Sequence, residues 1–164
     1  MPSHPVHPPE WIDSAPIVVD ESIVIHAPPS AVWAEIADHE SWPEWFTALD
    51  RVESGPTATG VGGTRRVTAQ RLPIDEEFTV WDENEHFAFG VTGSKLPILG
   101  ALAESVRLES LDDGASCRVT YRQGVQGRTG FGWAMKLVWS RAAAGLPPAL
   151  EALKLRVETH SSES

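Results

Sequence analysis

The chain has 164 residues and a mass of 17.9 kDa, which suits one domain, because domains commonly run to about 100–200 residues. Its composition, 41% hydrophobic and 22% charged, excludes a mostly disordered protein. The formal charge of −10 argues against partners such as nucleic acid or an anionic membrane, because affinity for phosphate groups comes mainly from Lys and Arg.

Several other classes of protein are excluded by what the sequence lacks. One cysteine, Cys117, allows no intramolecular disulfide and no zinc cluster, and it is expected to be a small buried filler. No nucleotide-binding, zinc-protease or nucleophile motif occurs. No apolar run resembles a signal peptide or approaches the roughly 20 residues of a membrane span. We therefore expect a cytoplasmic protein with no membrane span, no metal and no cofactor.

The chain order begins with an arm and a strand. Residues 1–16 carry five prolines and predict a flexible arm, because proline removes backbone donors and fixes φ. A single domain is expected over 17–158, and residues 159–164 are expected to form a disordered tail. The domain opens with residues 17–26, which are mostly β-branched and apolar and therefore predict a strand.

Two short helices are predicted next, within about residues 30–49. The first spans roughly 30–38, with Pro29 in its first turn, where a missing N–H costs little. Ser41 and Glu44 fit a capping box, in which Ser41 accepts from the Glu44 amide and the Glu44 carboxylate reaches back to the Ser41 amide. This pattern predicts the start of the second helix.

The remaining elements are six strands and a long helix. Turn signals rich in Gly, Pro and Asp separate the strand-like segments 51–54, 64–71, 74–81, 86–92, 102–110 and 116–123. Short connections between them predict an antiparallel meander. Residues 133–158 read as helical, and Pro147 and Pro148 predict a kink or a restart near Leu146.

This order predicts an α+β fold, in which a seven-stranded antiparallel sheet holds the long C-terminal helix. The space between helix and sheet is the natural ligand site, and we expect a cavity of a few hundred cubic ångströms there. The order resembles the START-like helix-grip (SRPBCC) superfamily, and most closely its polyketide cyclase/dehydrase and lipid-transport branch. The segments that carry the resemblance are Ile23–Trp33 (IVIHAPPSAVW), Asp38–Phe46 (DHESWPEWF), Val61–Val67 (VGGTRRV), Glu76–Asp82 (EEFTVWD) and Asp112–Tyr121 (DDGASCRVTY).

Strand parity selects the side chains expected to face the cavity. Glu76 shares a face with Phe78, and Glu104 shares one with Val106. Arg65 is the expected partner of Glu76, and a close pair is expected to lower the carboxyl pKa. The predicted catalytic candidates are Glu76, Arg65 and Tyr121, and the predicted ligand-binding residues are Phe78, Phe87, Phe89, Glu104, Val106, Tyr121 and Trp139.

Two functions stay open at this point. One is the binding or transport of a hydrophobic or aromatic small molecule in the internal cavity. The alternative, which the resemblance implies, is a polyketide-type aromatase/cyclase or dehydratase that uses the same cavity. The sequence does not decide whether a reaction is catalysed, and it leaves a homodimer open.

Overall fold

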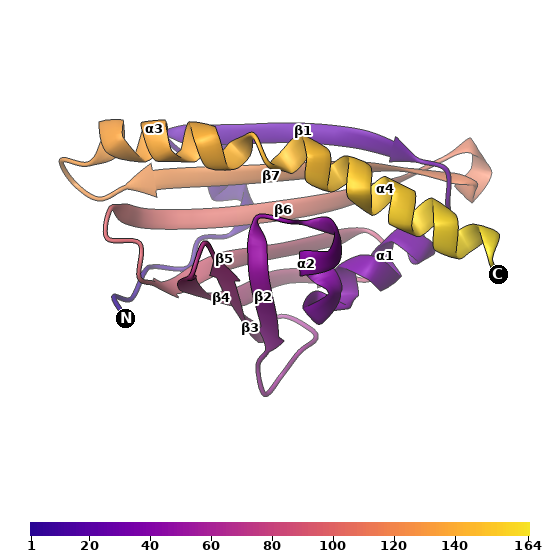
Figure 1. The fold of residues 1–164 in the computed structure, drawn as a ribbon, viewed down its shortest axis with the longest axis horizontal. Coiled ribbons are helices and arrows are strands. Elements are labelled where there is room, and N and C mark those ends of the chain that lie inside the picture. The colour runs from indigo at the N-terminus through magenta and orange to yellow at the C-terminus, as the bar shows by residue number, and fades with distance from the viewer.

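The computed structural model describes residues 1–164, and its centre is a curled sheet of seven antiparallel strands (Figure 1). The strands are β1 (Ile17–Ile25), β2 (Leu49–Ser54), β3 (Thr64–Ala69), β4 (Leu72–Asp82), β5 (His86–Ser94), β6 (Leu99–Leu111) and β7 (Ser116–Gly127). Their spatial order is β1-β7-β6-β5-β4-β3-β2. Strands β2 to β7 therefore form a meander, β1 pairs with β7, and the predicted α+β fold is confirmed.

Four α-helices accompany the sheet. They are α1 (Pro29–Ala37), α2 (Trp42–Trp45), α3 (Gly132–Ala143) and α4 (Leu146–Ser162). The restart predicted near Leu146 is confirmed, because α3 ends before Gly145 and the two prolines that follow lie in the first turn of α4, where no N–H is needed. The last helix runs on through most of the segment expected as a tail. No helix combines the length and the apolar character that crossing a membrane requires.

The predicted capping box is wrong. Ser41 has helical backbone angles (φ −83°, ψ −11°) because it already belongs to a 3₁₀ turn, His39–Ser41, that leads directly into α2. Its hydroxyl donates back to the carbonyl of Asp38 at 2.8 Å instead of accepting from α2. The Glu44 carboxylate accepts from Arg156 of α4, so its role is to tie the short helix to the long one.

Two separate hydrophobic clusters form the core. The larger packs apolar residues of α4 at helical spacing, among them Leu146, Leu150 and Leu153, with the aromatic side chains of the sheet and of α2. The smaller places Met135 of α3 against β5, β6 and β7. Burial of each such side chain contributes about 1.5–3 kcal/mol. The two clusters fix α4 and α3 independently, and the pocket described below draws its walls from both.

The N-terminal arm runs along the opposite face of the sheet. The Ile12 side chain is fully buried, and the His4 amide donates to the carbonyl of Thr92 at 2.8 Å. Gly124 allows this approach, because a Cβ there would lie 2.9 Å from the Cα of Ile12. Gln123 faces the pocket, so the next residue, Gly124, lies on the opposite face of the sheet. The arm therefore leaves the pocket uncovered.

Candidate functional site

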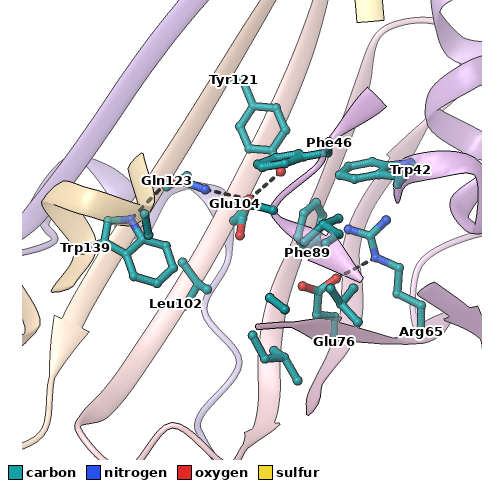
Figure 2. Close-up of a pocket in the computed structure, with 16 residues that line it drawn as sticks. Trp42, Phe46, Arg65, Glu76, Phe89, Leu102, Glu104, Tyr121, Gln123 and Trp139 are labelled. Carbon is teal, nitrogen blue, oxygen red and sulfur yellow. Dashed lines mark hydrogen bonds and ion pairs between the residues drawn. The ribbon is translucent and has the colours of Figure 1, made fainter. Parts of the chain in front are cut away.

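A pocket of about 100 Å³ lies among α2, α3 and the inner face of the sheet (Figure 2). Twelve of its sixteen lining residues are apolar or aromatic, and the other four are Arg65, Glu76, Glu104 and Gln123. The cavity is smaller than the few hundred cubic ångströms expected, because large aromatic side chains fill much of the space between helix and sheet. A cavity of about 150 Å³ can hold benzene, so this smaller, partly open pocket holds one ring only when part of the ligand extends out of it.

Arg65 and Glu76 form a buried ion pair at one side of the pocket. They are directly opposite on β3 and β4, and Nε of Arg65 donates to Oε2 of Glu76 at 2.6 Å, with side chains only 1% and 5% exposed. The guanidinium also lies 4.1 Å above the ring of Trp42 and 4.4 Å from that of Phe89. This fixes both charges in place, and each of them has its partner.

The expected lowering of the Glu76 pKa is wrong. Burial raises the pKa of this carboxyl, and the charge and hydrogen bond of Arg65 oppose the rise only in part. Loss of hydration outweighs the attraction here because almost no water reaches either group.

His39 supports the same arginine from behind. Its Nε2–H donates to the carbonyl of Ala58 at 3.1 Å, so its Nδ1 is free to accept from Nη1 of Arg65 at 3.3 Å. Burial, with the charge of Arg65 adding, lowers the His39 pKa to about 3. The imidazole therefore stays neutral and holds the guanidinium as an acceptor. Sequence reasoning missed this role, because nothing near His39 in the sequence indicates burial.

A chain of hydrogen bonds at the other side of the pocket ends on Glu104. The indole N–H of Trp139 donates to Oε1 of Gln123 at 3.1 Å, and because an indole can only donate, this contact fixes the orientation of the Gln123 amide. The amide nitrogen then donates to Oε2 of Glu104 at 3.2 Å. The hydroxyl of Tyr121 donates to the same oxygen at 2.5 Å.

Of the two carboxyl groups in the pocket, that of Glu104 forms no ion pair, whereas that of Glu76 is paired with Arg65. Burial, with the nearby Glu76 carboxyl adding, raises its pKa to about 7, although the bonds from Tyr121 and Gln123 pull it down. Both donors occupy Oε2, so a proton on the neutral acid sits on Oε1. Figure 2 shows that oxygen directed into the space between Leu102 and Phe89. Below a pH of about 7 the neutral carboxylic acid therefore predominates, and its O–H faces the cavity.

The pocket brings together most, but not all, of the residues predicted from the sequence. Arg65, Glu76, Phe89, Glu104, Tyr121 and Trp139 line it, and the lining also includes Trp42, Phe46 and Gln123, which parity reasoning missed. Three of the predicted ligand-binding residues, Phe78, Phe87 and Val106, are buried in the larger core cluster and do not border this pocket. Strand parity gives the face on which a side chain lies but not whether another ring covers it.

Two other chemical possibilities find no support at this site. Cys117 is fully buried in the core, and burial raises the pKa of its thiol to about 11, so the nucleophilic thiolate is suppressed. No group of three or more His, Cys, Asp or Glu side chains has an arrangement that could hold a metal ion.

Comparison with known proteins identifies the family. Residues 16–158 match the family described as polyketide cyclase / dehydrase and lipid transport. The chain belongs to this family. An uncharacterized protein of Mycobacterium tuberculosis is 29% identical over 113 residues, which are 68% of this chain and 66% of the relative. The match thus spans slightly less than two thirds of that relative's length.

Solved structures from the wider superfamily share the fold of this chain. The Zhui aromatase/cyclase of Streptomyces sp. R1128 superposes with a TM-score of 0.73 at 17% identity, covering 87% of this chain and 93% of that one. A START superfamily protein of Mycobacterium smegmatis gives 0.71 at 14% identity, covering 87% and 97%. These likenesses establish the helix-grip fold. The family membership supports hydrophobic ligand binding or a cyclase-type activity in general terms.

Proposed function

We propose that this protein binds a small apolar carbonyl compound and that the Glu104 carboxylic acid donates a hydrogen bond to the carbonyl oxygen. The observation that carries the proposal is the position of the proton. Tyr121 and Gln123 both donate to Oε2, so Oε1 is left to act as the donor toward the pocket. An apolar ligand with an acceptor oxygen satisfies that group, whereas a pure hydrocarbon leaves it unpaired, which costs about 1–3 kcal/mol.

The other polar groups of the pocket support a structural role more than ligand recognition. Arg65 donates to Glu76 and His39 and is stacked on aromatic rings, so the charge of this pair is already satisfied. The remaining walls are apolar or aromatic, which favours a ring. The size of the cavity favours a ligand of about one ring, or one end of a longer ligand whose remainder extends through the open side.

A matched pair of ligands tests the proposal. Acetophenone and ethylbenzene have nearly the same shape, and only acetophenone carries a carbonyl oxygen. We expect calorimetric or NMR titration at pH 6 to give at least a tenfold tighter Kd for acetophenone than for ethylbenzene. Glu104→Gln should reduce this ratio of Kd values, since an amide N–H is a weaker donor. Glu109→Gln, an exposed position on the same strand, should change nothing. Equal affinity for the two compounds, or binding of neither, would overturn the proposal.

A second function rests on the same carboxyl. A group with a pKa of about 7 can both hold and release a proton near neutral pH, which suits a general acid that activates a ketone for ring closure or assists loss of water. In this function the hydrogen bond from Tyr121 holds the Glu104 carboxyl in position, and Glu104 replaces Glu76 as the best candidate for proton transfer. A linear polyketone that can cyclise to an aromatic ring is the test substrate. Glu104→Gln should abolish its turnover, and Glu109→Gln should retain it.

A further inference from the structure

The exposed side of α3 has a composition unlike the rest of this acidic protein. From Gly114 to Leu150 the sequence contains five cationic residues and no Asp or Glu. Two of the five are neutralised, because Arg118 pairs with Glu109 and Arg122 pairs with Asp13 and Asp20. The other three, which form no ion pair with any carboxylate, are Arg128, Lys136 and Arg141.

Large apolar side chains are exposed on the same surface. Trp133 is 74% exposed, Leu137 50% and Phe131 49%. Trp133, Leu137 and Arg141 follow one another at intervals of four along α3, and Lys136 lies beside them, so they occupy one face of the helix. We call the α3 face the surface formed by Arg128, Phe131, Trp133, Lys136, Leu137 and Arg141.

The α3 face is open and lies next to the pocket. Figure 1 shows α3 at the periphery of the molecule, with no other element outside it. Arg128, Trp133 and Lys136 border one hollow on the surface, and no carboxylate lines that hollow. On its inner side the same helix contributes Trp139 and Ala142 to the wall of the pocket. A partner that covers the outer side of this helix therefore lies one helix away from the pocket.

We propose that the α3 face binds an anionic lipid surface, with α3 lying in the plane of the interface. Amphipathic helices of this kind combine Trp, Phe and Leu, which enter the boundary between headgroups and acyl chains, with Lys and Arg, which pair with lipid phosphates. The hollow between Arg128 and Lys136 has the charge to seat one headgroup. The net charge of −10 does not prevent this contact, because charges farther from the membrane than about a Debye length are screened, and no carboxylate lines the hollow beside Arg128 and Lys136.

Charge complementarity favours a membrane over a second copy of the chain. A two-fold dimer through this face would set Arg128, Lys136 and Arg141 of one copy close to the same cations of the other, and no carboxylate in the segment would neutralise them. A lipid surface supplies negative charge together with an apolar layer for Trp133 and Phe131. Binding to the membrane does not depend on the carbonyl proposal, although it would place the pocket beside a reservoir of apolar compounds.

Flotation with lipid vesicles tests the proposal. We expect the protein to bind vesicles of phosphatidylcholine with 30% phosphatidylglycerol at low salt, to bind vesicles of pure phosphatidylcholine at least tenfold more weakly, and to dissociate in 0.5 M salt. Trp133→Ser combined with Lys136→Glu should reduce binding to the anionic vesicles at least tenfold. The matched control, Leu155→Ser with Lys95→Glu, removes an exposed apolar residue and an exposed cation elsewhere and should leave binding unchanged.

Both double variants alter exposed positions, so circular dichroism and thermal unfolding should match those of the parent. Failure of the parent to bind anionic vesicles would overturn the proposal, and so would equal loss of binding in the two double variants. The proposal would also be overturned if the α3 face bound an acidic protein and the protein did not bind vesicles. Acetophenone titration of the α3 variant keeps this result separate from the function of the pocket.

Discussion

The hydroxyl of Tyr121 donates to Oε2 of Glu104 across the β6–β7 pair, at 2.5 Å. In the register of these strands Tyr121 stands opposite Val106, and Gln123 stands opposite Glu104. The tyrosine therefore reaches the carboxyl diagonally while the glutamine reaches it directly, and both bond to the same oxygen. This arrangement turns the second oxygen toward the pocket and makes the carboxyl a donor whenever it is neutral.

Replacing the tyrosine should raise the Glu104 pKa further. Tyr121→Phe removes a hydrogen bond that favours the ionised carboxyl, so we expect the pKa to move above its value of about 7. The lost hydrogen bond should cost about 1 kcal/mol of stability. A ¹³C NMR titration of the Glu104 carboxyl in protein labelled at glutamate measures the shift. An unchanged or lower pKa would contradict the proposed role of Tyr121.

Glu104 should also make stability depend on pH in a defined direction. Its pKa is raised from 4.5 in the unfolded chain to about 7 in the folded protein, so the folded state binds the proton more tightly. The stabilisation is complete below pH 4.5 and is lost as the pH rises through 7. The loss is on the order of 3 kcal/mol if the whole shift is realised.

Comparison with Glu104→Gln isolates this contribution. Relative to the parent, the variant should gain stability steadily between pH 4.5 and 7 and show no further gain above that range. Urea unfolding of both proteins at a series of pH values measures the difference. A parent that becomes more stable relative to the variant as the pH rises would show that the carboxyl is not held in its neutral form.

The buried and exposed ion pairs on β3 and β4 form a matched comparison. Glu76→Gln leaves the buried charge of Arg65 without its partner and should cost about 3–5 kcal/mol. Asp75→Asn breaks the neighbouring pair with Arg66, which is largely exposed, and should cost at most about 1 kcal/mol. Urea unfolding measures the loss of stability in both variants. Similar losses in the two variants would contradict a structural role for the buried pair.

Cys117 should be unreactive in the folded protein. The side chain is fully buried and its thiol has a pKa of about 11, so at pH 8 almost no thiolate is present or accessible. A colorimetric disulfide reagent should react with less than one tenth of the protein over an hour and with all of it in concentrated guanidinium. Rapid reaction without denaturant would show that the core around β7 opens.

The sequence was sufficient to predict the fold and the half of the site that contains Arg65 and Glu76. Period-two patterns placed Arg65 and Glu76 on the inner faces of neighbouring strands, and the hairpin between them brings two such residues opposite each other. The restart at Leu146 followed from the backbone chemistry of proline. These predictions depend on local periodicity and on short connections, both of which a single sequence contains.

The other half of the site depends on tertiary packing. Parity placed Phe87 and Phe89 on the same face, but only Phe89 borders the cavity, because the rings of Phe78 and Trp42 pack around Phe87. Gln123 lies in phase with Tyr121, a signal that could have identified it. The volume of the cavity depends on how these rings fill it, and no pattern in the sequence encodes that volume.

The central claim is that neutral Glu104 donates its proton toward a bound carbonyl oxygen, and the pH dependence of binding tests it most directly. The measurement is the ratio of the Kd values for acetophenone and ethylbenzene between pH 6 and pH 9, in the parent and in Glu104→Gln. In the parent the preference for the ketone should fall at least tenfold as the pH rises through about 7, because the ionised carboxylate repels the carbonyl oxygen, and in the variant it should stay constant. A preference for the ketone that is independent of pH in the parent, or that grows as the pH rises, would contradict the claim.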